Sequence, residues 1–271
     1  MKNIDSKDHM VFMLIGEEKW HSFYYFSPQI YPDYLKDIAN SCSDRFALTL
    51  HYYYQLQPAI NRDKKDCLIQ LNRNCVNLNF PSSPERIAYY HSISTIACIH
   101  GFLYSVKSFL DIISSLWISL ACEKYQDGNF SKKNIDGEIL SGGSIINWLN
   151  RSSPASFTNS NSLAELIELN SKKWITEMVG FRDGLTHKGE ISNLLPVRVK
   201  MEAMKKKYEL SDLLDPIMPN KIPVREYFFQ AITNLNSLIF ESLTLFENIK
   251  RDQIKNLSIG KESELKVPNN G

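Results

Sequence analysis

Hydrophobic residues recur every three or four positions along several long stretches of the chain, the spacing that places them on one face of an α-helix. Three such stretches begin at Pro32, Arg86 and Val224, and the last two run to about residues 125 and 255. The apolar stripe of the first consists of Leu35, Ile38, Ala39, Cys42, Phe46, Leu50 and Tyr53. Pro58 is expected to end or kink that helix, because proline lacks the N–H that an interior helical residue donates.

A further helix is predicted over residues 163–188. Ser162 and Glu165 have the spacing of a capping box at its start. At its end, Lys188 places a cation on the negative pole of the helix and Gly189 can adopt a positive φ. The apolar stripe of this helix consists of Leu163, Leu166, Ile167, Leu169, Trp174, Met178 and Phe181.

Shorter elements are predicted between the helices. Residues 127–161 are rich in Ser, Asn and Gly and form a long connection with one short helix around Ile145–Leu149. Val197–Met201 alternates like a strand, and the apolar run Val11–Ile15 could pair with it. The pattern therefore predicts an all-α fold, an up-and-down bundle of long helices, with a small β element formed by the N-terminal arm and the 197–201 segment.

The chain has no Pro-rich or Gly/Ser-rich linker between two apolar halves, so we expect one main domain. Residues 1–31 form an N-terminal arm and residues 32–255 the helical domain, with insertions at 127–161 and 190–223. Residues 256–271 form a polar C-terminal tail.

Charge and cysteine content narrow the possible partners. The formal net charge is +1, so affinity for a polyanion must come from local clusters of basic residues. Five cysteines without a CxxC pair fit a reducing cytosol, and the apolar run near the N-terminus is too short to span a membrane. The sequence contains no HExxH, P-loop or dinucleotide-binding pattern. We therefore expect a cytoplasmic protein with no metal, cofactor or membrane partner.

The most informative polar feature is a pair, Arg182 and His187, near the end of an apolar helix. An arginine is permanently charged, and an imidazole exchanges protons near its ordinary pKa of ~6.5. These two groups are sufficient to cleave RNA without a metal, since one can neutralise the phosphate and the other can act as a general base.

The short distance in sequence between an arginine and a following histidine does not by itself distinguish this pair. Two other arginines are followed by a histidine at a similar distance, namely Arg45 by His51 and Arg86 by His91. Arg182 differs because an acid, Asp183, follows it, and because Gly184 is expected to loosen the last helical turn. Such loosening would let His187 turn toward the side of the helix from which Arg182 projects.

In this context the chain resembles the HEPN superfamily (higher eukaryotes and prokaryotes nucleotide-binding). Its ribonuclease members carry Arg, usually Asn, Asp or His, a few further residues, and then His, which Arg182-Asp183 and His187 match. The architecture also fits, because HEPN domains are helical bundles with this motif late in the third core helix. One toxin subgroup, silenced by an adenylyltransferase, has a tyrosine two residues after the histidine, where this chain has Gly189.

The resemblance implies a metal-independent endoribonuclease that cleaves single-stranded RNA through attack of the ribose 2′-OH. It implies a homodimer that brings two Arg/His pairs into one cleft. It also points to a toxin or phage-defence effector, with an antitoxin protein as a further partner. The main alternative is a non-catalytic HEPN-like helical module that binds nucleotide, RNA or a protein, and a plain scaffold is a weaker one.

Several residues are predicted to support the pair. Asp183 would hold Arg182 or His187 in place. On the second long helix a polar row consists of His100, Tyr104, Lys107 and Asp111. Lys107 and Asp111 are either a buried ion pair under the cleft or an ordinary i, i+4 surface pair. His100 is expected to be a hydrogen-bonded core histidine.

Basic residues after the motif could follow the RNA backbone. The candidates are Lys188, Arg198 and Lys200. The alternative is a basic face that is simply solvated, which is the more common role of such runs.

Overall fold

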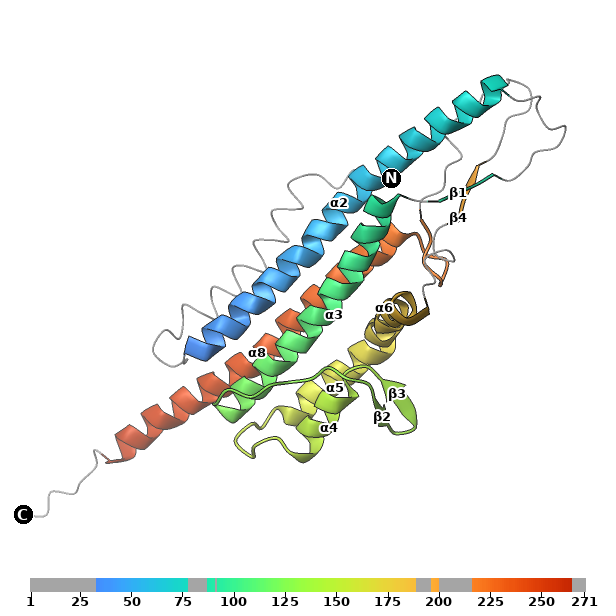
Figure 1. Ribbon diagram of the computed structural model, residues 1–271. Helices are drawn as coiled ribbons and strands as arrows, with labels where there is room; N and C mark the ends of the chain where they lie inside the picture. Colours follow the sequence, from blue (N-terminus) through green and yellow to red (C-terminus); the bar gives the residue numbers. More distant parts are fainter. Residues whose placement is uncertain (1–32, 78–86, 91, 189–195, 200–215, 265–271) are drawn as a thin grey trace, which may run out of the picture. The chain divides into compact units, whose positions relative to one another are not determined.

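The computed structural model describes residues 33–77, 87–90, 92–188, 196–199 and 216–264 (Figure 1). The helices are α2 (Asp33–Asn77), α3 (Ile93–Cys122), α4 (Gly143–Arg151), α5 (Ser160–Asn170), the π-helical turn η1 (Ser171–Ile175), α6 (Thr176–Lys188) and α8 (Val224–Glu264). The strands are β1 (Ile87–Tyr90), β2 (Lys133–Ile135), β3 (Glu138–Leu140) and β4 (Pro196–Val199). The described chain is thus mainly α, as the hydrophobic pattern predicts.

The first long helix does not end at its proline. α2 continues through Pro58 to Asn77, so of the two predicted alternatives an end at Pro58 is wrong, and a kink there stays a prediction. A proline removes one backbone hydrogen bond from a helix. Leu56, Ala59 and Ile60 on either side of Pro58 are almost completely buried, and their packing outweighs that loss.

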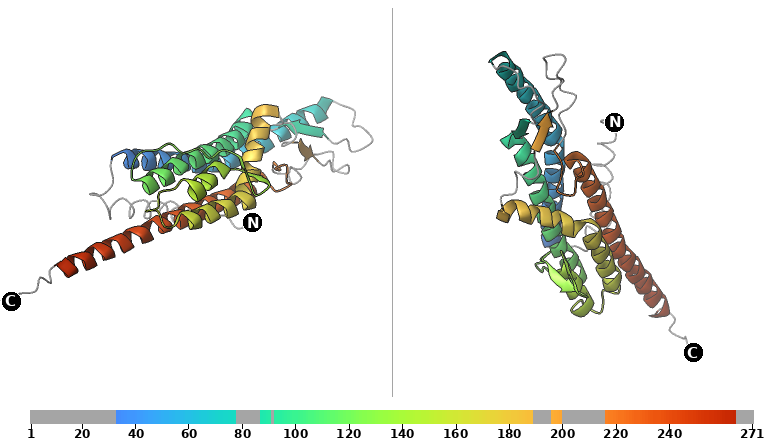
Figure 2. Two further views of the ribbon diagram at one scale, coloured as in Figure 1. Left: turned by 90° about the horizontal axis from the view of Figure 1, so that it is seen from below. Right: turned by 90° about the vertical axis from the view of Figure 1, so that its right-hand side faces the viewer.

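The second long helix begins later than predicted. Residues 87–90 form β1, which pairs antiparallel with β4 in the register Ile87↔Val199 to Tyr90↔Pro196. Both strands appear in the right-hand view of Figure 2, β1 in teal and β4 in orange. The predicted strand near residues 197–201 is therefore present, but its partner is β1. The suggested partner, Val11–Ile15, lies outside the described residues. β-branched and aromatic residues favour strands, which is a preference that helical spacing alone does not reveal.

Contacts divide the chain into two compact units. The motif unit consists of Cys42–Leu110 and Trp174–Thr233. The hairpin unit consists of Met1–Ser41, Asp111–Lys173 and Asn234–Gly271. The predicted Arg/His pair belongs to the first unit, and the β2–β3 hairpin belongs to the second.

In the motif unit, α3 packs against its neighbours through both apolar and polar contacts. The ring of Phe102 stacks on that of Phe228 in α8, with centroids 3.7 Å apart. On the side toward α2, the Thr49 hydroxyl donates to the hydroxyl of Ser105 at 3.0 Å. All four side chains are completely or almost completely buried. These contacts make the motif unit a helical bundle with a core on α3.

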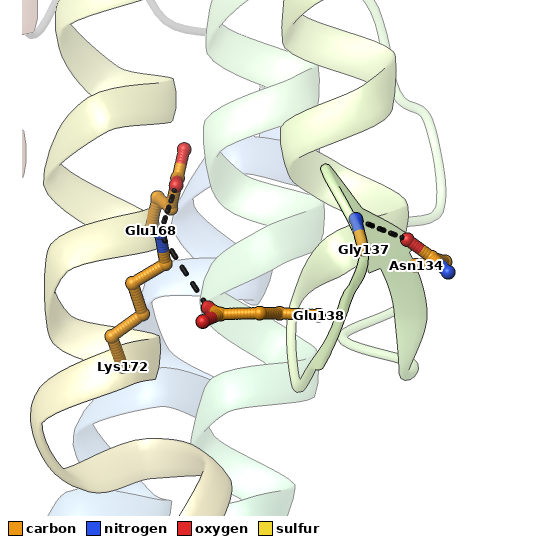
Figure 3. Close-up of polar contacts among 5 residues, drawn as sticks. All are labelled: Asn134, Gly137, Glu138, Glu168 and Lys172. Atoms are coloured by element: carbon orange, nitrogen blue, oxygen red, sulfur yellow. Dashed lines mark hydrogen bonds and ion pairs between the residues drawn. The ribbon is translucent and has the colours of Figure 1, made fainter.

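The hairpin unit contains more regular structure than a long connection. The predicted short helix is confirmed as α4, and β2 pairs with β3 through a turn at Asp136 and Gly137, which both have positive φ. Lys172 of η1 lies 2.7 Å from Glu168 and 3.6 Å from Glu138, so its ammonium group links the hairpin to α5 (Figure 3).

The helix that leads to the motif is interrupted by the π-helical turn η1. This wider turn keeps Ile167, Ser171 and Ile175 buried at steps of four residues. Leu169, predicted to belong to the buried stripe, is 64% exposed. The predicted capping box is also wrong, because α5 begins at Ser160 and no side chain caps it.

Among the described residues, α3 is the one helix long and apolar enough to cross a membrane, and half of its most apolar 18-residue segment is buried. The core helix of a soluble protein has the same length and composition. The large side chains of α3 that are fully buried include Phe102, Leu103, Phe109 and Trp117. These buried side chains are those of a core helix, and the cytoplasmic location stays a prediction.

Candidate functional site

The helix α6 carries the predicted motif in the motif unit. It runs without interruption from Thr176 to Lys188. Arg182 and Asp183 are described together with their side chains, whereas at His187 and Lys188 the structure describes the backbone alone. The position of the imidazole therefore lies outside the described part of the chain.

The guanidinium of Arg182 is held at a partly exposed position. Its Nη2 atom lies 3.1 Å from Oδ1 of Asp183, and the two side chains are 22% and 30% exposed. Its Cζ atom lies 5.9 Å from the centroid of the Tyr104 ring, within the range of a cation–π contact. The Nε atom is buried and has no hydrogen-bond partner within the described residues.

A second contact joins α3 to α6 at this point. The hydroxyls of Tyr104 and Thr186 are 2.5 Å apart, and Thr186 Oγ1 donates to the backbone oxygen of Arg182 at 2.8 Å. A threonine hydroxyl has a single proton. Because that proton goes to Arg182, the Tyr104 hydroxyl is the donor to Thr186.

The helical geometry of α6 differs from the expectation at its end. At 3.6 residues per turn, position 186 lies about 40° around the axis from Arg182 and position 187 lies about 140° away. The helix stays regular through Gly184, so the predicted loosening of the last turn is wrong. Within one chain, Thr186 therefore lies on the same face of α6 as Arg182, and position 187 does not.

His100 lies beside this contact, with its ring centroid 6.4 Å from that of Tyr104. Burial lowers the pKa of the His100 imidazole, so the ring is neutral at neutral pH. Its Nε2 atom is buried and accepts or donates no hydrogen bond within the described residues. The expectation of a hydrogen-bonded core histidine is therefore wrong for that nitrogen.

Lys107 and Asp111, the ion pair predicted on α3, belong to different compact units. Lys107 lies in the motif unit, and Asp111 lies in the hairpin unit, where its Oδ1 accepts a hydrogen bond from the backbone N–H of Phe130 at 3.2 Å. Both side chains are half-buried rather than buried. Asp111 thus anchors the loop after α3, and support of the cleft by this pair stays a prediction.

The basic residues proposed to contact RNA are described in part. Lys188 ends α6, and Arg198 pairs with Ala88 in the β1–β4 sheet, both as backbone alone. Lys200 lies outside the described residues. Their contacts with RNA stay predictions.

Two residues of the site were not identified as such from the sequence. Tyr104 belongs to the polar row on α3, but its partner could not be inferred. Thr186 follows Arg182 by four residues, which is the spacing of residues on one helix face. This spacing could have identified Thr186 as a neighbour of Arg182.

Within the described residues, no group of three or more His, Cys, Asp or Glu side chains could hold a metal ion. Comparisons with models of protein families, with curated proteins and with solved structures gave no match.

Proposed function

We propose that the protein is a metal-independent endoribonuclease of HEPN type that cleaves single-stranded RNA with Arg182 and His187. The observation that supports this proposal is the placement of the Arg182 guanidinium. It is partly exposed and fixed by the Tyr104 ring and by Asp183. It is carried by the helix that also bears position 187.

The guanidinium is suited to binding a phosphate. An arginine has five N–H donors, and in Arg182 the ion pair with Asp183 engages one terminal nitrogen. The remaining terminal donors can bind two oxygens of the scissile phosphate, which stabilises the charge that develops on them. A lysine lacks this planar geometry.

The His187 imidazole acts as the general base in this proposal. It removes the proton of the ribose 2′-OH, and the oxygen attacks the adjacent phosphorus. The bond from phosphorus to the 5′-oxygen breaks, and that oxygen takes up a proton from solvent. The products are a 2′,3′-cyclic phosphate and a 5′-OH.

The test is cleavage of labelled single-stranded RNA in the presence of EDTA. Wild-type protein should cut, and Arg182→Ala and His187→Ala should each lower the rate at least about 100-fold. The matched control is the double variant Arg45→Ala/His51→Ala, which removes a similarly spaced, exposed pair from α2 and should retain activity. Equal cleavage by all variants, or its loss in EDTA, would contradict the proposal.

The role of the 2′-OH gives a second test. An oligonucleotide with a single deoxyribose at the cleaved position should resist cleavage there, because no nucleophile is present. Cleavage at the deoxyribose would exclude the mechanism.

One observation favours the alternative of a non-catalytic binding module. Positions 182 and 187 lie about 140° apart on a regular helix, so one chain does not place them on a common face. Binding of RNA that survives His187→Ala, without cleavage at any protein concentration, would select this alternative.

The biological role proposed is that of a toxin or phage-defence effector, based on the HEPN resemblance. Induced expression should then arrest bacterial growth, and Arg182→Ala should relieve the arrest. Equal growth arrest by both proteins would argue against this role.

A further inference from the structure

We propose that Tyr104 is a positioning residue of the ribonuclease site, which fixes the end of α6 through two separate contacts. This inference rests on the proposed function. Tyr104 lies on α3 and therefore belongs to a different helix from the Arg/His pair that it orients.

The first contact is made by the ring. The Cζ atom of Arg182 lies 5.9 Å from its centroid, so the aromatic face attracts the guanidinium. Asp183 engages the same guanidinium through Nη2 at 3.1 Å. With a ring on one side and a carboxylate on a terminal nitrogen, few orientations of the Arg182 side chain remain.

The second contact is made by the hydroxyl. It donates to Thr186 Oγ1, which in turn donates to the backbone oxygen of Arg182. This chain of two hydrogen bonds ties the last turns of α6 to α3. Thr186 directly precedes position 187, so the contact that restrains Arg182 also restrains the backbone of the proposed base.

Tyr104 is partly exposed, so an effect of its substitution on activity can be distinguished from an effect on core packing. Its side chain is 42% exposed, in contrast to its completely buried neighbours on α3, Phe102, Leu103 and Val106. Removing the hydroxyl therefore opens no cavity and leaves the core packing unchanged. A loss of activity in such a variant would report on the position of α6 rather than on folding.

The test compares Tyr104→Phe and Thr186→Val, which remove the two hydroxyls while keeping the side-chain shapes. Each should lower kcat about tenfold and leave KM nearly unchanged, because misplacement of a group that stabilises the transition state affects the chemical step. Thr186→Ser, which keeps the hydroxyl, should restore the rate. Circular dichroism and thermal unfolding should match those of the wild type.

The matched control is Tyr125→Phe. Tyr125 is also an exposed tyrosine, and its hydroxyl donates to Oδ1 of Asp127 at 2.6 Å in the hairpin unit. This variant loses a comparable hydrogen bond and should retain full activity.

A double-mutant cycle tests whether the two hydroxyls act as one contact. The variant Tyr104→Phe/Thr186→Val should be no slower than either single variant, since all three lack the same hydrogen bond. Tyr104→Leu also loses the ring contact and should be about two- to fivefold slower than Tyr104→Phe.

The outcomes separate this inference from the proposed function. If Arg182→Ala and His187→Ala abolish cleavage but Tyr104→Phe and Thr186→Val keep the wild-type kcat, the positioning role is wrong and the ribonuclease stands. Additive losses in the double variant would also overturn the role. If Arg182→Ala and His187→Ala cleave as fast as the wild type, both proposals fail.

Discussion

Asp63 is a buried carboxylate in α2 that binds the start of another helix. Its Oδ2 atom accepts hydrogen bonds from the backbone N–H of Ser92 at 3.1 Å and from the hydroxyl of Thr95 at 2.7 Å. The side chain lies at the N-terminus of α3, where the helix dipole favours a negative charge. One residue thus fixes the register between two long helices of the motif unit.

Replacement of this carboxylate should destabilise the fold. We expect Asp63→Ala to lower the free energy of unfolding by about 2 kcal/mol, because it leaves the part-buried N–H of Ser92 and the buried hydroxyl of Thr95 without their charged acceptor. Asp63→Asn keeps one acceptor oxygen and should lose about half as much. Chemical denaturation measures both, with the exposed Asp44→Ala of the same helix as control. Equal stabilities of Asp63→Ala and Asp44→Ala would refute the capping role.

His100 should make stability depend on pH. Burial lowers the pKa of its imidazole in the folded state, so the unfolded chain binds the proton more tightly. The contribution of His100 to stability is therefore complete above the unfolded pKa of about 6.5 and is lost as pH falls toward the folded value. The melting temperature should fall less between pH 6.5 and 5 in His100→Gln than in the wild type. Parallel curves would rule out this contribution.

At the scale of elements, two glycines of the hairpin unit have the same backbone requirement but different surroundings. Gly137 and Gly142 have φ values of +93° and +84°. A Cβ at Gly137 would meet no atom within 4 Å, whereas one at Gly142 would lie 2.5 Å from the buried ring of Phe130. The β2–β3 turn therefore needs glycine for its conformation alone, and the start of α4 needs it also for space.

This difference predicts unequal costs for the same substitution. Gly137→Ala should lower the free energy of unfolding by about 1 kcal/mol, from the left-handed conformation alone. Gly142→Ala should lower it by about 3 kcal/mol, since displacement of Phe130 adds to that cost. Chemical denaturation compares them directly. Equal losses would show that the Phe130 ring moves without cost.

The elements also show where sequence patterns stop being sufficient. Long apolar stripes identified α2, α3 and α8, because burial of one face dominates in helices of that length. They failed at the start of α3, where β1 pairs with a strand more than 100 residues later. They failed at Leu169 as well, because it lies about 200° around the regular helix α5 from the buried Ile167 and therefore on the opposite face.

At the scale of the whole molecule, the homodimer predicted for this protein has a direct test. Position 187 lies about 140° around α6 from Arg182, so in the ribonuclease proposal the arginine of one chain would have to meet the histidine of the other. Neither Arg182→Ala nor His187→Ala should then be active alone. Mixed and refolded together in equal amounts, they should regain about a quarter of the wild-type activity. About half of the dimers are mixed, and each of these has one intact site.

The same experiment distinguishes sites within one chain. If Arg182 and His187 act together within a single chain, every mixed dimer lacks a complete site and the mixture stays inactive. Sedimentation of the wild type provides the control for association. A wild-type monomer that cleaves RNA at the full rate would contradict the predicted homodimer.

The sequence by itself determined the helical class, the approximate positions of the long helices and the chemistry available at Arg182 and His187, but neither the end of α2 nor the start of α3. These properties follow from local periodicity and from side-chain type, which a linear pattern contains. Only the tertiary structure decided that Tyr104 and Thr186 meet beside Arg182, that β4 pairs with β1 and that Asp63 caps α3. Each of these contacts joins residues about 30 or more positions apart, and the packing of entire helices, rather than any local preference, brings such residues together.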